Sequence, residues 1–153
     1  AALWVAAKTM PSRLLTGDGL DIKPSDNAEM LKALSRDELV IKATRVDVLY
    51  GVSNLMDTAM LASTDVHCNI LLMYGKHDEI IPAEPTCKLL ERLSSNNPIN
   101  LETNVYEHGY HMLTRDLQAE VVLQDLAAWI IEHKQPTERG EDMHRYCAIL
   151  DRA

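Results

Sequence analysis

The sequence has no run of basic residues and no apolar stretch long enough to cross a membrane as a helix. Its 153 residues contain 15 lysines and arginines against 23 aspartates and glutamates, which gives a formal net charge of -8. A surface of this sign repels phosphate backbones, so nucleic acid is not expected as a partner. Hydrophobic residues make up 46% of the chain, which is enough for a packed core.

Cysteine is also scarce. Cys68, Cys87 and Cys147 are too few and too scattered to predict a disulfide framework, and no C-x-x-C pair is present for zinc or redox chemistry. We therefore expect all three to be small core or surface residues without a reactive role. Free thiols fit a reducing compartment, which predicts a cytoplasmic protein.

The chain lacks an initiating methionine, and its apolar start, "AALWVAAKTMPSRLL", has no charged residue ahead of the apolar run. It therefore does not have the pattern of a secretory signal. We interpret this stretch as the interior of a longer protein.

Residues before position 66 show helical patterns and no convincing strand. Residues 24–36 contain Ser25 or Asp26 as a helix N-cap, with Glu29 at the capping-box spacing from Asp26. Apolar residues between 49 and 60 recur at spacings of three and four, as in an amphipathic helix. Gly51 interrupts this pattern and is expected to mark a turn or kink.

After residue 66 the pattern alternates between strand and helix. Residues 70–75 and 101–106 are predicted strands, and residues 82–93 and 116–133 are predicted helices, the second with Arg115 and Asp116 as its caps. Residues 136–153 resemble a polar tail with a small apolar patch. Alternation of this kind implies a parallel sheet, but two strands are too few to stand alone. We expect the remaining strands to come from sequence before residue 1.

The two predicted strands should bring polar loops together. Asp78 follows the first strand and a histidine-containing loop, "EHGYH", follows the second, so both lie at the carboxyl edge of the sheet. A carboxylate bonded to one nitrogen of an imidazole ring fixes its tautomer and leaves the other nitrogen free for acid and base chemistry. The spacing thus predicts a hydrogen bond between Asp78 and a histidine of this loop. His77 should face solvent.

The segments "LLMYGKHDEIIP", "VYEHGYHMLTRD" and "VLQDLAAWI" resemble the C-terminal half of the α/β-hydrolase fold. The closest branch holds monoacylglycerol lipases and lysophospholipases, the serine aminopeptidase-like hydrolases. The resemblance implies that Asp78 is the triad acid and that His111, preceded by Gly109, is the triad base. His108 matches no catalytic position. The implied fold is α/β, a parallel sheet flanked by helices, with a helical cap over residues 1–66, core over 67–135 and tail over 136–153.

The triad serine of this fold sits in a G-x-S-x-G elbow, and the sequence has none. The nearest string, "GVSNL" at 51–55, ends in leucine and falls in a helical stretch, so we interpret Ser53 as an ordinary helix residue. The nucleophile and the oxyanion-hole amides are then expected before residue 1, in the N-terminal half of the same enzyme. The chain alone is expected to be inactive.

The implied function is hydrolysis of lipid-like carboxylic esters, such as a monoacylglycerol or a lysophospholipid, without a cofactor. Leu55 and Met56 on the cap, with Met112 beside the histidine, are the predicted contacts for an acyl chain. The cap leaves open a transient contact with a membrane surface.

Three alternatives remain at this stage. His77, Asp78, His108 and His111 contain the donor types of a metal site. The protein is otherwise a non-catalytic binding protein on the same fold, or an enzyme that keeps the acid and the histidine but uses an upstream aspartate as nucleophile.

Overall fold

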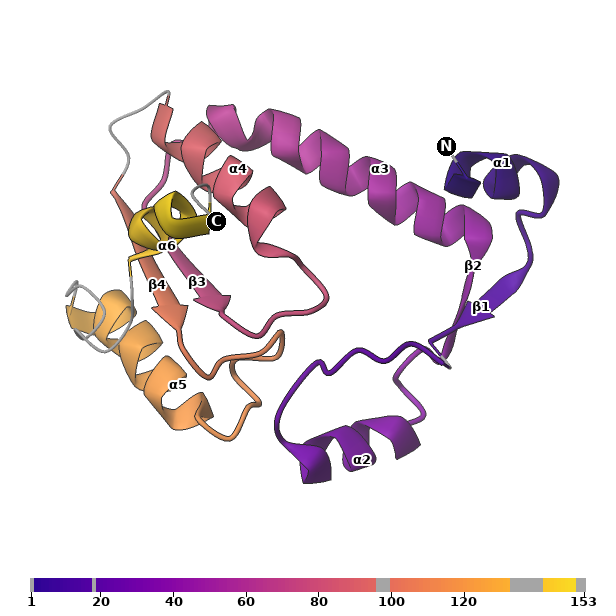
Figure 1. Ribbon diagram of the computed structural model, residues 1–153, viewed down its shortest axis with the longest axis horizontal. Coiled ribbons are helices and arrows are strands. Elements are labelled where there is room, and N and C mark those ends of the chain that lie inside the picture. Colours follow the sequence, from indigo (N-terminus) through magenta and orange to yellow (C-terminus); the bar gives the residue numbers. More distant parts are fainter. Residues whose placement is uncertain (1, 18, 96–99, 133–141, 151–153) are drawn as a thin grey trace.

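A strand–helix–strand unit lies at the centre of the C-terminal part of the chain. The protein is seen here in a computed structural model that describes residues 2–17, 19–95, 100–132 and 142–150. Strands β3 (Ile70–Gly75) and β4 (Leu101–Tyr106) pair in parallel, with Gly75 opposite Tyr106, and helix α4 (Ala83–Ser95) lies between them in sequence (Figure 1). Both predicted strands are confirmed with their bounds. The helix predicted over 82–93 is also confirmed, with bounds that differ by one or two residues.

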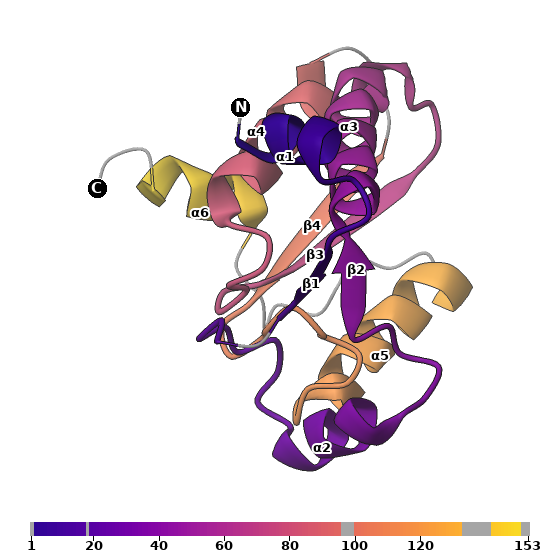
Figure 2. The ribbon, with the colours of Figure 1, turned by 90° about the vertical axis from the view of Figure 1, so that its right-hand side faces the viewer.

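Helices cover both faces of this two-stranded sheet. Helix α4 and helix α6 (Met143–Leu150) lie on one face, and helix α5 (Ala119–Ala127) lies on the other (Figures 1 and 2). Side chains along a strand alternate between the faces. Val105 therefore packs with Tyr74, Leu90 and Met143 in the core, whereas its neighbour Asn104 donates from its Nδ2 to Asp125 of α5 at 3.0 Å.

Helix α5 begins later than the sequence pattern predicts. Arg115 and Asp116 were expected to cap it, but the N-cap position is Gln118, and Asp116 is 4% exposed with its carboxylate engaged elsewhere. That prediction is wrong because a buried tertiary contact takes the acid. The helix continues as a short π-helical segment, η2 (Ala128–Glu132), and the predicted end at residue 133 lies outside the described residues.

The last described segment corrects two predictions. Residues 143–150 were expected to be part of a polar tail, but they form helix α6, in which Met143 is fully buried. Cys147 of this helix forms a disulfide with Cys87 of α4, so the expectation that the cysteines are unpaired is wrong for these two. Cys68 is free and exposed. The predicted boundary at residues 135–136 lies outside the described residues.

The N-terminal part contains two short strands that the helical patterns did not predict. Strand β1 (Leu14–Thr16) pairs antiparallel with strand β2 (Ala43–Arg45), and helix α1 (Ala2–Thr9) precedes them. Three-residue strands are too short to show the alternation that identifies a strand in sequence. The prediction that no strand precedes residue 66 is therefore wrong.

Two helices of this part also differ in detail from expectation. Helix α2 (Ala28–Arg36) has Asn27 as its N-cap, with Oδ1 accepting from the Met30 backbone N–H at 3.1 Å, in place of Ser25 or Asp26. Helix α3 (Val46–Ala62) runs unbroken through Gly51, so no turn or kink occurs there, and Ser53 lies within it as expected. A short 3₁₀ helix, η1 (Ser63–Asp65), leads to the sheet.

Helix α3 extends from the sheet toward α1, and much of its surface is exposed (Figure 1). Val52, Leu55 and Met56 are 50%, 67% and 54% exposed. Among the described residues, no helix has the length and apolar character needed to cross a membrane.

Candidate active site

The loops after β3 and β4 meet because two glycines allow their backbones to touch. A Cβ on Gly75 would collide with the carbonyl oxygen of Tyr110 and would lie 2.6 Å from the carbonyl carbon of Gly109. A Cβ on Gly109 would in turn lie 3.0 Å from the Gly75 Cα. The backbone N–H of His77 donates to the Gly109 carbonyl at 2.9 Å, which fixes the two loops together. Only glycine permits this approach.

This close contact makes Gly75 sensitive to substitution. We expect Gly75→Ala to lower the free energy of unfolding by about 1–3 kcal/mol. The added methyl group would clash with backbone atoms, which cannot move aside by changing a side-chain rotamer. Urea unfolding measures the effect. Gly51→Ala is the matched control, since nothing lies within 4 Å of its Cβ position in α3. It should raise stability by about 0.5–1 kcal/mol through helix propensity. Equal midpoints for Gly75→Ala and the unsubstituted protein would contradict the proposed steric role.

Asp78 and His111, separated by 33 positions in the chain, lie within hydrogen-bond distance of each other. His111 Nδ1 is 2.9 Å from Asp78 Oδ2. The other carboxylate oxygen, Oδ1, accepts from the backbone N–H groups of Ile80 and Ile81, both at 2.9 Å. Two backbone amides thus hold the carboxylate oxygen that does not face His111. Because an ionised carboxylate only accepts hydrogen bonds, the Nδ1 of His111 is the donor in this contact and carries the proton.

The exposure of these two side chains differs. The Asp78 side chain is 8% exposed and that of His111 is 38% exposed. No group among the described residues bonds to Nε2 of His111. The arrangement therefore leaves Nε2 open to a third group, which is the orientation that proton transfer between a histidine and a nucleophile requires.

A buried tyrosine of strand β3 forms a hydrogen bond to the loop that carries Asp78. The Tyr74 hydroxyl donates to the carbonyl of Ile81 at 2.9 Å. Burial, together with the negative charge of Asp78, raises the pKa of Tyr74 to about 12. The phenol therefore stays protonated and keeps this hydrogen bond throughout the neutral range.

The other histidines of the predicted site lie outside this pair. His108 is exposed on the loop, and His77 is exposed but stacks on the Tyr110 ring with centroids 5.3 Å apart. Within the part of the chain that the structure describes, no three histidine, cysteine or acidic side chains gather closely enough to hold a metal ion. His77, Asp78, His108 and His111 therefore do not converge as the metal-site alternative requires.

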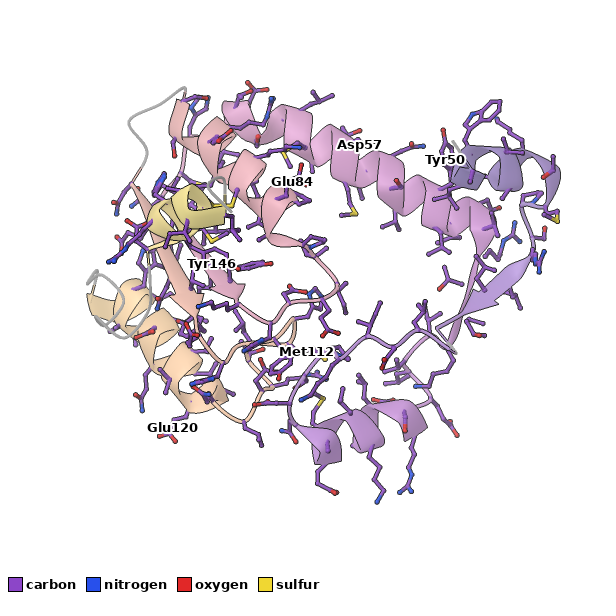
Figure 3. The ribbon with its side chains drawn as sticks, viewed as in Figure 1. Tyr50, Asp57, Glu84, Met112, Glu120 and Tyr146 are labelled. Carbon is purple, nitrogen blue, oxygen red and sulfur yellow. A yellow bond between two sulfur atoms is a disulfide. The ribbon has the colours of Figure 1, made fainter. Side chains whose placement is uncertain are left out.

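The three residues predicted to contact substrate are not brought together. Met56 lines a pocket of about 440 Å³ between α3, the Asp78 loop and α4, whose other lining residues include Met60, Ile81 and Leu89. Leu55 is on the same helix but is not among the lining residues. Met112 lies apart from α3, in the histidine loop, where its backbone N–H donates to Pro24 at 3.1 Å (Figure 3).

Sequence reasoning missed a segment that supports the histidine loop. Residues 23–27 lie against residues 110–117, and the buried hydroxyl of Ser25 donates to Asp116 Oδ1 at 2.6 Å. Lys23 Nζ donates to the Tyr110 hydroxyl at 3.2 Å and lies 4.7 Å from the centre of its ring. Asp116 ends the segment "VYEHGYHMLTRD" that carries His111, and this was the signal available in the sequence. The sequence pattern pointed to Ser25 only as a candidate N-cap and gave no sign of its contact with this loop.

Comparison with solved structures agrees with this architecture. The crystal structure of a monoacylglycerol lipase from Paleococcus ferrophilus superposes with a TM-score of 0.72 at 24% sequence identity, over 87% of this chain and 51% of that one. This likeness shows the fold, which is that of an α/β hydrolase, as the sequence predicted.

Sequence comparison gives the family. A monoacylglycerol lipase of Mycolicibacterium smegmatis is 26% identical in an alignment of 115 positions that covers 66% of this chain and 39% of that protein. The chain therefore spans about half, or less, of the length of these relatives. The family model described as serine aminopeptidase, S33, matches residues 1–118, well over half of the chain. The chain belongs to this serine aminopeptidase S33 family of hydrolases.

Proposed function

We propose that the protein that carries residues 1–153, here called the parent protein, hydrolyses lipid-like carboxylic esters through a serine, Asp78 and His111. The hydrogen bond of 2.9 Å between Asp78 and His111, with Asp78 fixed by two backbone amides, is the observation that supports this proposal. Family membership adds that the chemistry is hydrolysis.

The proposed mechanism assigns one role to each side chain. Asp78 holds the Nδ1–H of His111 and stabilises the imidazolium that forms. Nε2 then takes the proton of the nucleophile during attack and returns it to the leaving alcohol. The serine and the oxyanion-hole amides come from sequence outside this chain, and residues 1–66 act as the cap over a core that begins near residue 67.

The proposed substrate class follows from the apolar surface near Asp78. Ile81, three residues after Asp78, lines the pocket between α3 and α4 together with Met56 and Met60, whose side chains are flexible and apolar. Such a lining suits an acyl chain. The two relatives are described as monoacylglycerol lipases, which supports monoacylglycerols as the proposed substrate class of the parent protein.

The chain by itself should not turn over esters. We expect the isolated 153 residues to react with no fluorophosphonate probe and to hydrolyse no p-nitrophenyl ester, because the covalent step and the oxyanion stabilisation need groups outside the chain. The parent protein, assayed in parallel, should be labelled on one serine outside residues 1–153. Stoichiometric labelling of the isolated chain, with turnover, would overturn this division of the active site.

A further inference from the structure

Residues 24–27 form a continuous brace along the loop that carries His111. The Pro24 carbonyl accepts from the Met112 N–H at 3.1 Å, and Asp26 Oδ1 accepts from the Leu117 N–H at 2.8 Å. Asn27 Nδ2 donates to the Arg115 carbonyl at 3.0 Å. These segments are about ninety positions apart in sequence, so the contacts exist only in the folded protein.

The centre of this brace is a buried hydrogen bond between side chains. Ser25 is 0% exposed and donates to Asp116 Oδ1 at 2.6 Å, and Asp116 is 4% exposed. The second oxygen of Asp116 accepts from the backbone N–H of Tyr110 at 2.8 Å. Because Tyr110 directly precedes His111, this hydrogen bond joins the two ends of the segment 110–116 that contains the histidine. The hydrogen bond to Ser25 connects the same carboxylate to the segment before α2.

We propose that Ser25 and Asp116 are positioning residues that hold the His111 ring on Asp78. The inference rests on the proposed function, in which His111 is the catalytic base. His111 itself is partly exposed and is held on its ring only by Asp78 among the described residues. Its placement therefore depends on the backbone of residues 110–116, and the Asp116 carboxylate fixes that backbone.

Loss of either side chain should loosen the loop without unfolding the protein. Ser25→Ala removes the donor and leaves a buried carboxylate oxygen unpaired. Asp116→Asn keeps the shape, but its amide accepts only one of the two hydrogen bonds and presents a donor to the other. A displacement of about 1 Å at a reacting group costs about a hundredfold in rate. We therefore expect kcat to fall by about tenfold to a hundredfold in each variant.

The experiment measures kcat and KM of the parent protein on p-nitrophenyl acetate, whose short acyl group makes little use of the apolar pocket. We expect KM to change by no more than about twofold, since the pair does not contact substrate. The double variant Ser25→Ala/Asp116→Asn should be no slower than Asp116→Asn alone, because Ser25 acts through Asp116. Independent, multiplying losses in the double variant would overturn the coupling.

Asp125→Asn is the matched control for a buried carboxylate. Asp125 is 1% exposed and accepts from Asn104 and from the Tyr106 hydroxyl, on the face of the sheet covered by α5. This variant should lose stability as the others do but keep kcat. If Ser25→Ala and Asp116→Asn left kcat as high as Asp125→Asn does, the positioning role would be refuted.

A spectroscopic readout separates this inference from the proposed function. The proton on Nδ1 of a histidine bonded to a carboxylate gives a far-downfield resonance in the proton NMR spectrum. We expect this signal of His111 to broaden or disappear in Ser25→Ala and Asp116→Asn and to persist in Asp125→Asn. If the unsubstituted protein hydrolysed no ester, the proposed function would fail, yet the resonance would still test the positioning. An unchanged resonance in both variants would overturn it.

Discussion

Replacement of His111 by alanine in the parent protein should lower kcat/KM for ester hydrolysis by at least about ten-thousandfold. General acid–base catalysis alone is worth about a hundredfold to ten-thousandfold, and loss of one member of a triad usually costs more. No other histidine is bonded to Asp78 within the described residues, so no neighbouring ring takes over the proton transfer. Steady-state rates on a monoacylglycerol and on a p-nitrophenyl ester measure the loss.

Two further substitutions make this result specific. Asp78→Asn should also be severe, because the amide can favour the wrong tautomer of the imidazole ring. His108→Ala is the internal control, since it removes the same residue type from the same loop, three positions away, on an exposed site. Its rate should stay near that of the unsubstituted protein. A loss in His108→Ala as large as that in His111→Ala, with folding intact, would refute the assignment of His111.

The second large effect concerns stability. Replacing Cys87 and Cys147 with serine should lower the free energy of unfolding by about 4 kcal/mol, since the disulfide closes a loop between residues 60 positions apart. The crosslink joins α6 to α4 beside Met143, which is fully buried, so the variant also loosens this part of the core. Urea unfolding of the parent protein and of the double variant measures the difference.

Cys68→Ser serves as the control, because Cys68 is free and exposed. This variant should unfold at the same urea concentration as the unsubstituted protein. Thiol titration under denaturing, non-reducing conditions should detect Cys68 but not Cys87 or Cys147. Reactive Cys87 and Cys147 thiols in that assay would contradict the pairing. Because disulfides persist in oxidising compartments, the predicted cytoplasmic location now has no support from the cysteines.

Much of the fold and the site was predictable from local sequence. A continuous apolar run identified the strand at 70–75, because a strand buried on both faces has that pattern. The strand at 101–106 was also predicted, although it has no such run. Once both strands were placed in parallel, Asp78 and the histidine loop had to lie at the same edge. The choice of His111 over His108 came from the resemblance to a family, since the residues alone do not distinguish two histidines in one loop.

Several features were decided only by tertiary structure. Asp116 and Ser25 have the residue types of helix caps, but a buried hydrogen bond between segments 91 positions apart outweighs their local preference. The Cys87–Cys147 disulfide depends on how α6 packs against α4, which spacing does not reveal. The same packing brings Met143 into the core, because a helix of eight residues buries a side chain fully only where a partner surface exists. Local sequence thus determined the strand–helix–strand unit and the edge at which Asp78 and His111 meet. Long-range contacts, whose energies depend on burial and on distant partners, determined what holds them in place.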